Sequence, residues 1–175
     1  AITKGFAIGA AGLTVIALLG AFQEIVFSVT QKTIEFNLMD PLVFFGTLVG
    51  AAIPAVFSAM LMLGVNRNSQ KMVDEIHRQF NTIEGLKEGK PGVMPEYEKC
   101  IDIATVGAIK ELIPAGLTSI IITLIVGFVG GVQAMGGFLA GNIVTGLFLA
   151  LLMSNAGGLW DNAKKFIEAG NFGGK

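Results

Sequence analysis

The sequence 112-LIPAGLTSIIITLIVGFVGGVQAMGGFLAGNIVTGLFLALLMSNAGGLW-160 decides the fold of this protein. These 49 residues contain no Asp, Glu, Lys or Arg. A helix needs about 20 apolar residues to cross the hydrocarbon core of a bilayer, so the stretch is long enough for two crossings. The weakly apolar residues 130–137, GGVQAMGG, are the predicted turn between them. The sequence therefore predicts membrane-spanning helices over about 112–131 and 136–160.

Two further uncharged stretches, residues 5–23 and 41–66, predict spans over about 5–27 and 41–66. The composition agrees, because 53% of the 175 residues are hydrophobic and only 14% are charged, whereas soluble domains carry roughly 25% charged residues. We therefore predict an all-α fold, a polytopic transmembrane helix bundle with four spans, in which residues 1–175 form part of one integral membrane domain. A net charge of −1 gives no indication of a nucleic-acid partner. The single cysteine, Cys100, excludes an intrachain disulfide.

The residues between the second and third predicted spans, 67–111, are rich in charge and predict helical extensions and a loop outside the membrane. An apolar stripe at helical spacing continues past the second span: Met72, Val73, Ile76 and Phe80. This spacing indicates that the helix runs beyond the bilayer. At the other end of the same span, Asp40 precedes Pro41 and is the predicted N-cap.

Positive residues gather on one side of this predicted topology. With four spans, both ends of the chain share a side with residues 67–111. That side holds eleven Lys or Arg residues: Lys4, Arg67, Lys71, Arg78, Lys87, Lys90, Lys99, Lys110, Lys164, Lys165 and Lys175. The opposite side holds only Lys32. Because cytoplasmic loops carry an excess of Lys and Arg, both termini and residues 67–111 are predicted to be cytoplasmic.

Two other patterns concern packing and the extent of the chain. Small residues recur at four-residue spacing in the spans, as at Gly46 and Gly50 or Gly137 and Gly141, which predicts close helix–helix packing. The chain begins with Ala-Ile-Thr-Lys, without Met or a targeting signal, and ends on Asn-Phe-Gly-Gly-Lys. We therefore expect it to be a segment of a longer polypeptide.

The last predicted span ends in a compact block of charge that contains Asp161, Lys164 and Lys165. On a helix these three residues share one face, because positions three and four apart align. The residues alone leave three interpretations open. Trp160 and the lysines could form an interfacial anchor, in which Asp161 pairs with Lys165. The lysines could instead bind a lipid headgroup, or Asp161 could hold a divalent metal while the lysines neutralise phosphate oxygens.

Four motifs carry a resemblance to a known family: TKGFAIGAAGLT, RQFNTIEGL, IKELIPAG and, most specifically, SNAGGLWDNAKKFIEAG. In the same order along the chain, they resemble the carboxy-terminal half of the membrane-bound, ion-pumping inorganic pyrophosphatases. The resemblance implies hydrolysis of pyrophosphate at a cytoplasmic magnesium site, coupled to pumping of protons or sodium ions, with K⁺ or Na⁺ as further cofactor ions. It also implies a subunit of about sixteen spans and a homodimer, with this chain as the twelfth to fifteenth spans.

Carried over residue by residue, the resemblance makes Asp161 a magnesium ligand and Lys164 and Lys165 pyrophosphate-binding residues. It also places Lys4 at the mouth of the site as a substrate-binding residue, although on the residues alone Lys4 is simply an interfacial lysine. The aspartate-rich motifs that supply most metal ligands in this family are absent from the sequence. The resemblance therefore assigns no water-activating residue to this chain, which by itself would be inactive and would form one wall of a site completed by the rest of the polypeptide. A different class of function also stays open, a helical segment of a secondary transporter or membrane scaffold without catalysis.

Overall fold

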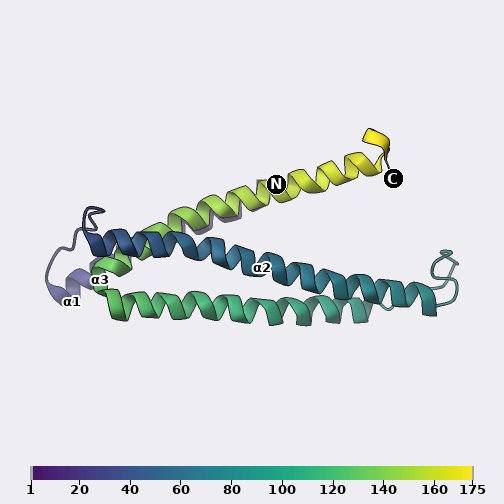
Figure 1. Cartoon of the computed structure of the whole chain (residues 1–175), viewed down its shortest axis with the longest axis horizontal. Helices are drawn as coiled ribbons and strands as arrows, with labels where there is room; N and C mark the ends of the chain where they lie inside the picture. The colour runs from purple at the N-terminus through teal and green to yellow at the C-terminus, as the bar shows by residue number, and fades with distance from the viewer. Residues whose placement is uncertain (1, 175) are drawn as a thin grey trace. The chain divides into compact units, whose positions relative to one another are not determined.

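The computed structural model describes residues 2–174, so that Lys175, counted above among the positive residues, lies outside the described residues. Three long helices follow one another: α1 (Ile2–Thr30), α2 (Pro41–Thr82) and α3 (Tyr97–Glu168), with a short 3₁₀ helix, η1 (Asn171–Gly173), at the end (Figure 1). Residues 2–174 include no β-strand. The prediction of an all-α fold is confirmed.

All three long helices are long and apolar enough to cross a membrane, with mean hydropathies of 2.0, 2.2 and 2.3 in their most apolar windows. The structure thus has three long helices where the sequence predicted four spans. The third, α3, has 72 residues, which at 1.5 Å per residue exceeds by far the roughly 30 Å of a bilayer core. It is interrupted at Gly131, whose φ of 69° and ψ of −166° are not helical. Glycine tolerates this conformation because it has no Cβ. The interruption falls in the predicted turn, with residues 112–131 and 136–160 on its two sides.

The beginning of α2 follows the sequence prediction. Asp40 Oδ1 accepts hydrogen bonds from the backbone N–H groups of Leu42 (2.8 Å) and Val43 (3.4 Å), so that Asp40 is the N-cap. At its other end α2 continues to Thr82, well past the predicted span that ends at residue 66. The helix is thus longer than the predicted span, and its extension beyond the bilayer stays a prediction.

The chain divides into two compact units. One unit consists of the residues up to Ala55 together with those from Thr123 onward, and the other of Val56–Ile122. The first unit contains α1, the beginning of α2 and the second part of α3. The second unit contains the remainder of α2, the loop after it and the first part of α3.

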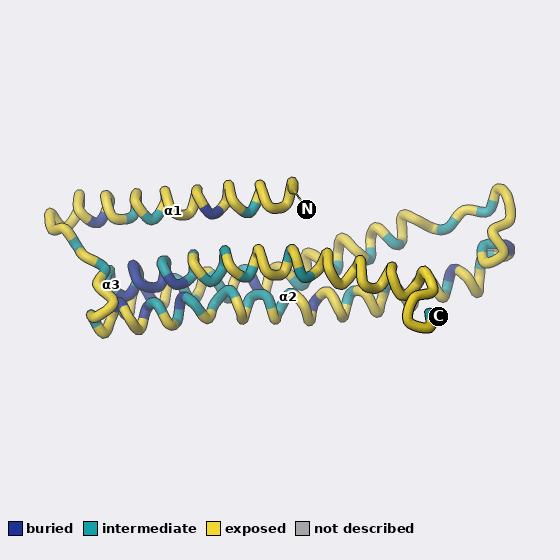
Figure 2. Tube along the Cα trace, turned by 90° about the horizontal axis from the view of Figure 1, so that it is seen from above, coloured by how far each residue is buried: buried dark blue, intermediate teal, exposed yellow. Residues whose placement is uncertain are grey.

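Glycines bring α2 and α3 together in the first unit. A Cβ added at Gly46 would lie 2.0 Å from the carbonyl oxygen of Ala134, and one at Gly50 would lie equally close to that of Phe138. In the opposite direction, a Cβ at Gly137 would lie 2.1 Å from the carbonyl oxygen of Val43. The two backbones are thus in direct contact, as small residues permit in membrane helices. Buried residues are concentrated here (Figure 2), and both Val43 and Phe138 are only 1% exposed.

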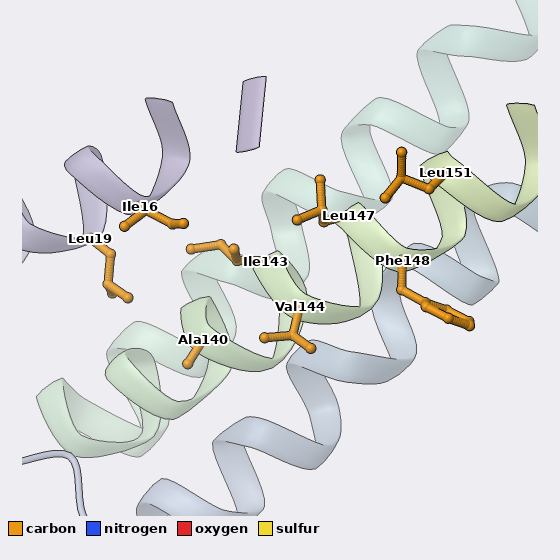
Figure 3. A pocket seen from close by; sticks show the side chains of 8 residues that line it. All are labelled: Ile16, Leu19, Ala140, Ile143, Val144, Leu147, Phe148 and Leu151. Atoms are coloured by element: carbon orange, nitrogen blue, oxygen red, sulfur yellow. The ribbon is translucent and has the colours of Figure 1, made fainter. Parts of the chain in front are cut away.

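Helix α1 lies along the second part of α3, and the two run antiparallel. Gly12 of α1 faces Leu147, whereas Phe36, in the loop after α1, contacts Gly136. Between the helices is an apolar groove of about 420 Å³, lined by Ile16 and Leu19 of α1 and by α3 residues from Ala140 to Leu151. Figure 3 shows Ile143 and Leu147 directed toward α1 across this groove. Most of α1 remains exposed, because only Gly12 and Val26 are buried among its described residues.

In the second unit, polar side chains of α2 are buried and apolar ones are exposed, the reverse of what the sequence pattern suggested. The stripe that the sequence singled out is largely exposed, with Val73 42%, Ile76 39% and Phe80 45% accessible. By contrast, Glu75 and Gln79 are only 7% and 3% exposed. The polar face of α2 with Glu75 and Gln79 therefore packs toward the start of α3, whereas of the apolar stripe Met72 is partly buried and Val73, Ile76 and Phe80 are exposed.

Candidate functional site

The charged block lies in the last two turns of α3, which ends at Glu168. Gly170 then adopts a left-handed conformation with φ of 97°, which ends the helix. Asn171 supports this end, because its Nδ2 donates a hydrogen bond to the carbonyl oxygen of Phe166 at 2.9 Å. A helix C-terminus favours positive side chains, so Lys164 and Lys165 are well placed in the last turn.

Two ion pairs organise the block along the helix. Lys165 Nζ lies 2.7 Å from Asp161 Oδ2, whereas Lys164 Nζ lies 3.8 Å from Glu168 Oε1. The hydrogen bond from Lys165 lowers the pKa of Asp161 below its usual value, and the same pair raises the pKa of Lys165. Asp161 and Lys165 are therefore both charged at neutral pH. The pairing of Asp161 with Lys165 is the arrangement that the anchor interpretation predicted.

The block is also open to a ligand. The side chains of Asp161, Lys165 and Lys164 are 56%, 67% and 70% exposed. The longer Lys164–Glu168 separation exceeds hydrogen-bond length, which leaves the Lys164 ammonium free to donate to an anion. Two ammonium groups on adjacent residues are suited to neutralising phosphate oxygens.

The block holds two carboxylates, Asp161 and Glu168, each of which lies near a lysine. Lys165 occupies Oδ2 of Asp161, so that Oδ1 is the oxygen available to a metal. Residues 2–174 contain no group of three or more His, Cys, Asp or Glu side chains that could hold a metal ion. Mg²⁺ is commonly bound through one or two carboxylates together with substrate phosphates and water. Asp161 therefore fits a magnesium site only as one ligand among others.

Lys4 lies in the first turns of α1, at the same end of the first unit as the charged block. Gly12 of α1 and Leu147 of α3 face each other and provide a common reference point. Lys4 precedes Gly12 by eight residues, about 12 Å along α1. Asp161 follows Leu147 by fourteen residues, about 21 Å along α3. Since the two helices are antiparallel, these distances run in the same direction. Within residues 2–174 no ion pair or hydrogen bond joins Lys4 to Asp161, Lys164 or Lys165. The structure thus brings three of the four predicted site residues together and leaves Lys4 separate.

A second polar cluster was missed from the sequence. Glu75 accepts hydrogen bonds from Arg78 at 2.7 and 2.9 Å and from Gln79 at 2.8 Å, and Arg78 also pairs with Glu96. The hydrogen bonds from Arg78 and Gln79 lower the pKa of Glu75 to about 2, with a smaller contribution from Lys99. Acids and bases three and four residues apart are also typical of an exposed helix face, which is why their spacing did not identify this cluster.

The lowered pKa of Glu75 predicts how the second unit responds to acid. The folded value of about 2 lies below the ordinary value of 4.5, so ionised Glu75 contributes its full stabilisation above about pH 4.5 and loses it as the pH falls toward 2. Spin labels at His77 and Asp102, in a Cys100→Ala background, should give a distance distribution that is unchanged to about pH 4 and broadens near pH 2. In a Glu75→Gln variant, the distance distribution should be broad over this whole pH range. Broadening centred near pH 4.5 in the unsubstituted cluster would show that Glu75 is not held as described.

Comparison with known proteins adds a family to this geometry. All residues from 1 to 175 match the family model described as inorganic H⁺ pyrophosphatase. The chain is 47% identical to a K⁺-insensitive pyrophosphate-energized proton pump of Chloroflexus aurantiacus and 42% identical to one of Methanosarcina mazei, with all of the chain covered in both. It is 41% identical to the K⁺-stimulated pyrophosphate-energized sodium pump of Thermotoga maritima, with 99% of the chain covered.

The matched region is a limited part of these relatives. It corresponds to 24%, 25% and 24% of the three proteins, so the chain spans about a quarter of their length. The similarity nevertheless extends from one end of the chain to the other and includes the block at Asp161, Lys164 and Lys165. The chain belongs to the inorganic H⁺ pyrophosphatase family.

Proposed function

We propose that this chain is part of a membrane-bound enzyme that hydrolyses inorganic pyrophosphate at a cytoplasmic magnesium site and couples the hydrolysis to pumping of protons or sodium ions. The observation that carries the proposal is the exposed carboxylate and lysine pair at the end of an apolar helix, in a chain that matches the pyrophosphatase family over its whole length. The relatives named above include both proton and sodium pumps. A secondary transporter or scaffold is not favoured, since the relatives are named for pyrophosphate-energized pumping.

In this proposal Lys164 and Lys165 bind the phosphate oxygens of pyrophosphate, and Asp161 is one ligand of Mg²⁺. Lys4 approaches the substrate from α1. Phosphoryl transfer depends mainly on positioning and charge neutralisation, which two adjacent ammonium groups can supply. Bound magnesium would neutralise phosphate charge and lower the pKa of a coordinated water. The proposed monovalent cofactor ions are K⁺ or Na⁺, and the names of the relatives distinguish K⁺-stimulated from K⁺-insensitive pumps.

The other parts of the site come, in this proposal, from elsewhere in the subunit. The single carboxylate at Asp161 is too few ligands for Mg²⁺ on its own, and the relatives are about four times as long as this chain. We therefore propose that the remainder of the same polypeptide supplies the missing carboxylates, in a subunit of about sixteen spans that forms a homodimer. Apolar surfaces such as α1 would contact lipid or the other spans.

We further propose that the chain crosses the membrane four times, over about 5–27, 41–66, 112–131 and 136–160. The non-helical backbone at Gly131 supports a division of α3 into two crossings. Both termini of the segment and residues 67–111 would be cytoplasmic, which the distribution of Lys and Arg supports. The charged block then lies at the cytoplasmic end of the last span.

This topology predicts which cysteines react from which side. In a full-length protein with its own cysteines removed, Lys87→Cys should react with a membrane-impermeant maleimide from the cytoplasmic side only. Lys32→Cys, in the loop after α1, should react from the opposite side only. The comparison is made in vesicles of both orientations. Labelling of the two variants from the same side would contradict the four-span topology.

The function itself is tested with the full-length protein in inside-out membrane vesicles. Adding pyrophosphate and Mg²⁺ should release phosphate and generate either a pH gradient or uptake of ²²Na⁺. Omitting Mg²⁺ should abolish both signals. Vesicles that contain correctly inserted protein but hydrolyse no pyrophosphate would overturn the proposal and leave the transporter or scaffold interpretation.

A further inference from the structure

The start of α3 is held by a side chain of α2. Gln79 Oε1 accepts a hydrogen bond from the backbone N–H of Glu96 at 2.9 Å, and Gln79 Nε2 lies 3.2 Å from the carbonyl oxygen of the same residue. The side-chain amide therefore bonds to both the backbone N–H and the backbone carbonyl of one residue, Glu96. Glu96 directly precedes the first residue of α3, Tyr97. The N–H groups at the start of a helix lack partners within the helix, and here one is satisfied by a residue seventeen positions away.

Gln79 is in turn fixed by a buried carboxylate. Its Nε2 donates to Glu75 Oε1 at 2.8 Å, and Arg78 donates to both oxygens of Glu75. The Arg78 guanidinium also bridges to the Glu96 carboxylate, so that Glu96 is held through its backbone and its side chain. Lys99, in the first turn of α3, adds a weaker contact to Glu75 at 3.9 Å. The cluster thus connects α2 and α3 at several points.

Polar rather than apolar side chains of α2 are buried in this connection. The apolar stripe of α2 at Val73, Ile76 and Phe80 is exposed, while Glu75 and Gln79 are buried. A buried ionised carboxylate is tolerated only when its partners satisfy it, and removing one partner leaves the rest uncompensated. Next to the loop, contact between the two helices therefore depends on a complete set of polar contacts, whereas farther from the loop Arg67 of α2 pairs with Glu111 of α3.

We propose that Glu75, Arg78 and Gln79 form a clamp that keeps the hairpin of α2 and α3 closed, so that the two helices move as one body around the loop at residues 83–96. The clamp is defined by these three residues and by their partner Glu96. It belongs to the second unit, whereas the charged block of α3 belongs to the first. Its loss opens the hairpin without removing any residue of the proposed pyrophosphate site. An experiment can therefore refute the clamp without refuting the proposed function, and the reverse.

Cys100 provides a natural reporter of this clamp. It is partly buried, and its Sγ lies 3.6 Å from Gln79 Nε2. In the full-length protein with other cysteines removed, Cys100 should react slowly with N-ethylmaleimide. Gln79→Leu keeps a similar side-chain volume but removes both hydrogen bonds to Glu96. Gln79→Leu and Glu75→Gln should each accelerate labelling by about tenfold, because opening of the local structure limits the reaction.

The matched control is His77→Gln, on the exposed face of the same helix turn, which should label at the unsubstituted rate. A second measurement needs no substitution. In hydrogen exchange of the unsubstituted protein, the amide of Glu96 should be protected well beyond those of loop residues 86–93. Labelling of both clamp variants within twofold of the control overturns the proposal. Rapid exchange of the Glu96 amide also overturns it. Because this measurement uses the unsubstituted protein, it decides the proposal even when a clamp variant does not accumulate in the membrane.

Discussion

Replacing Lys164 with alanine in a full-length pyrophosphatase that carries this segment is expected to abolish magnesium-dependent hydrolysis, a loss of about 100-fold or more. The Lys164 side chain is 70% exposed, and its Nζ lies 3.8 Å from the carboxylate of Glu168. It is therefore the group of the block that is freest to donate to a phosphate. Phosphate release from membranes at saturating Mg²⁺ and pyrophosphate measures the effect.

Lys165→Ala and Asp161→Ala are expected to abolish hydrolysis for a different reason. Lys165 holds Asp161 Oδ2 at 2.7 Å, so either substitution removes a charge and also releases the orientation of its partner. Raising the Mg²⁺ concentration should restore part of the activity of Lys165→Ala, which retains the carboxylate, and none of that of Asp161→Ala.

Lys87→Ala is the matched control for these substitutions, because it removes a lysine from the loop between α2 and α3 and should leave turnover unchanged. Protein amounts in the membrane must be equal in all variants. Near-normal turnover in all three site variants would exclude the proposed site. The block would then be an interfacial anchor, in which the Asp161–Lys165 pair only stabilises the end of α3 by the small amount typical of exposed pairs.

Local sequence signals predicted the helices well. The uncharged stretches located all three apolar helices, and Asp40 before Pro41 predicted the N-cap at the start of α2. The break at Gly131 falls in the glycine-rich turn expected from composition. These features depend on nearest neighbours along the chain, on hydropathy and on the special backbone freedom of glycine. They are therefore accessible without tertiary contacts.

The features that sequence reasoning missed depend on pairing between distant residues. Gln79 was unremarkable in a charged stretch, and only the fold places it against Glu96. The apolar stripe of α2 suggested a helix correctly, but gave no indication that Glu75 rather than Ile76 would be buried. In the site, helical spacing placed Asp161 and Lys165 on one face, whereas the position of Lys4 depends on how α1 lies along α3.

The glycine contact between α2 and α3 predicts the largest effect on stability. A Cβ at Gly50 would lie 2.0 Å from the carbonyl oxygen of Phe138, and one at Gly137 would lie 2.1 Å from that of Val43. Both obstacles are backbone atoms, which cannot move aside as the end of a side chain can. Gly50→Ala and Gly137→Ala are each expected to destabilise the full-length protein by about 3 kcal/mol or more, at or above the upper end of ordinary overpacking costs.

The loss should appear as a lower midpoint in thermal unfolding of the detergent-solubilised protein. The double variant should be less than additive, because both glycines lie in the same helix–helix interface. Gly20→Ala is the control, since a Cβ there meets no atom within 4 Å and alanine favours the helix. Gly20→Ala should leave the midpoint unchanged or raise it slightly. If Gly50→Ala and Gly137→Ala were no more destabilising than Gly20→Ala, α2 and α3 would not meet through these backbones. The close approach matters for the proposed function because it fixes α2 to the helix that carries Asp161, Lys164 and Lys165.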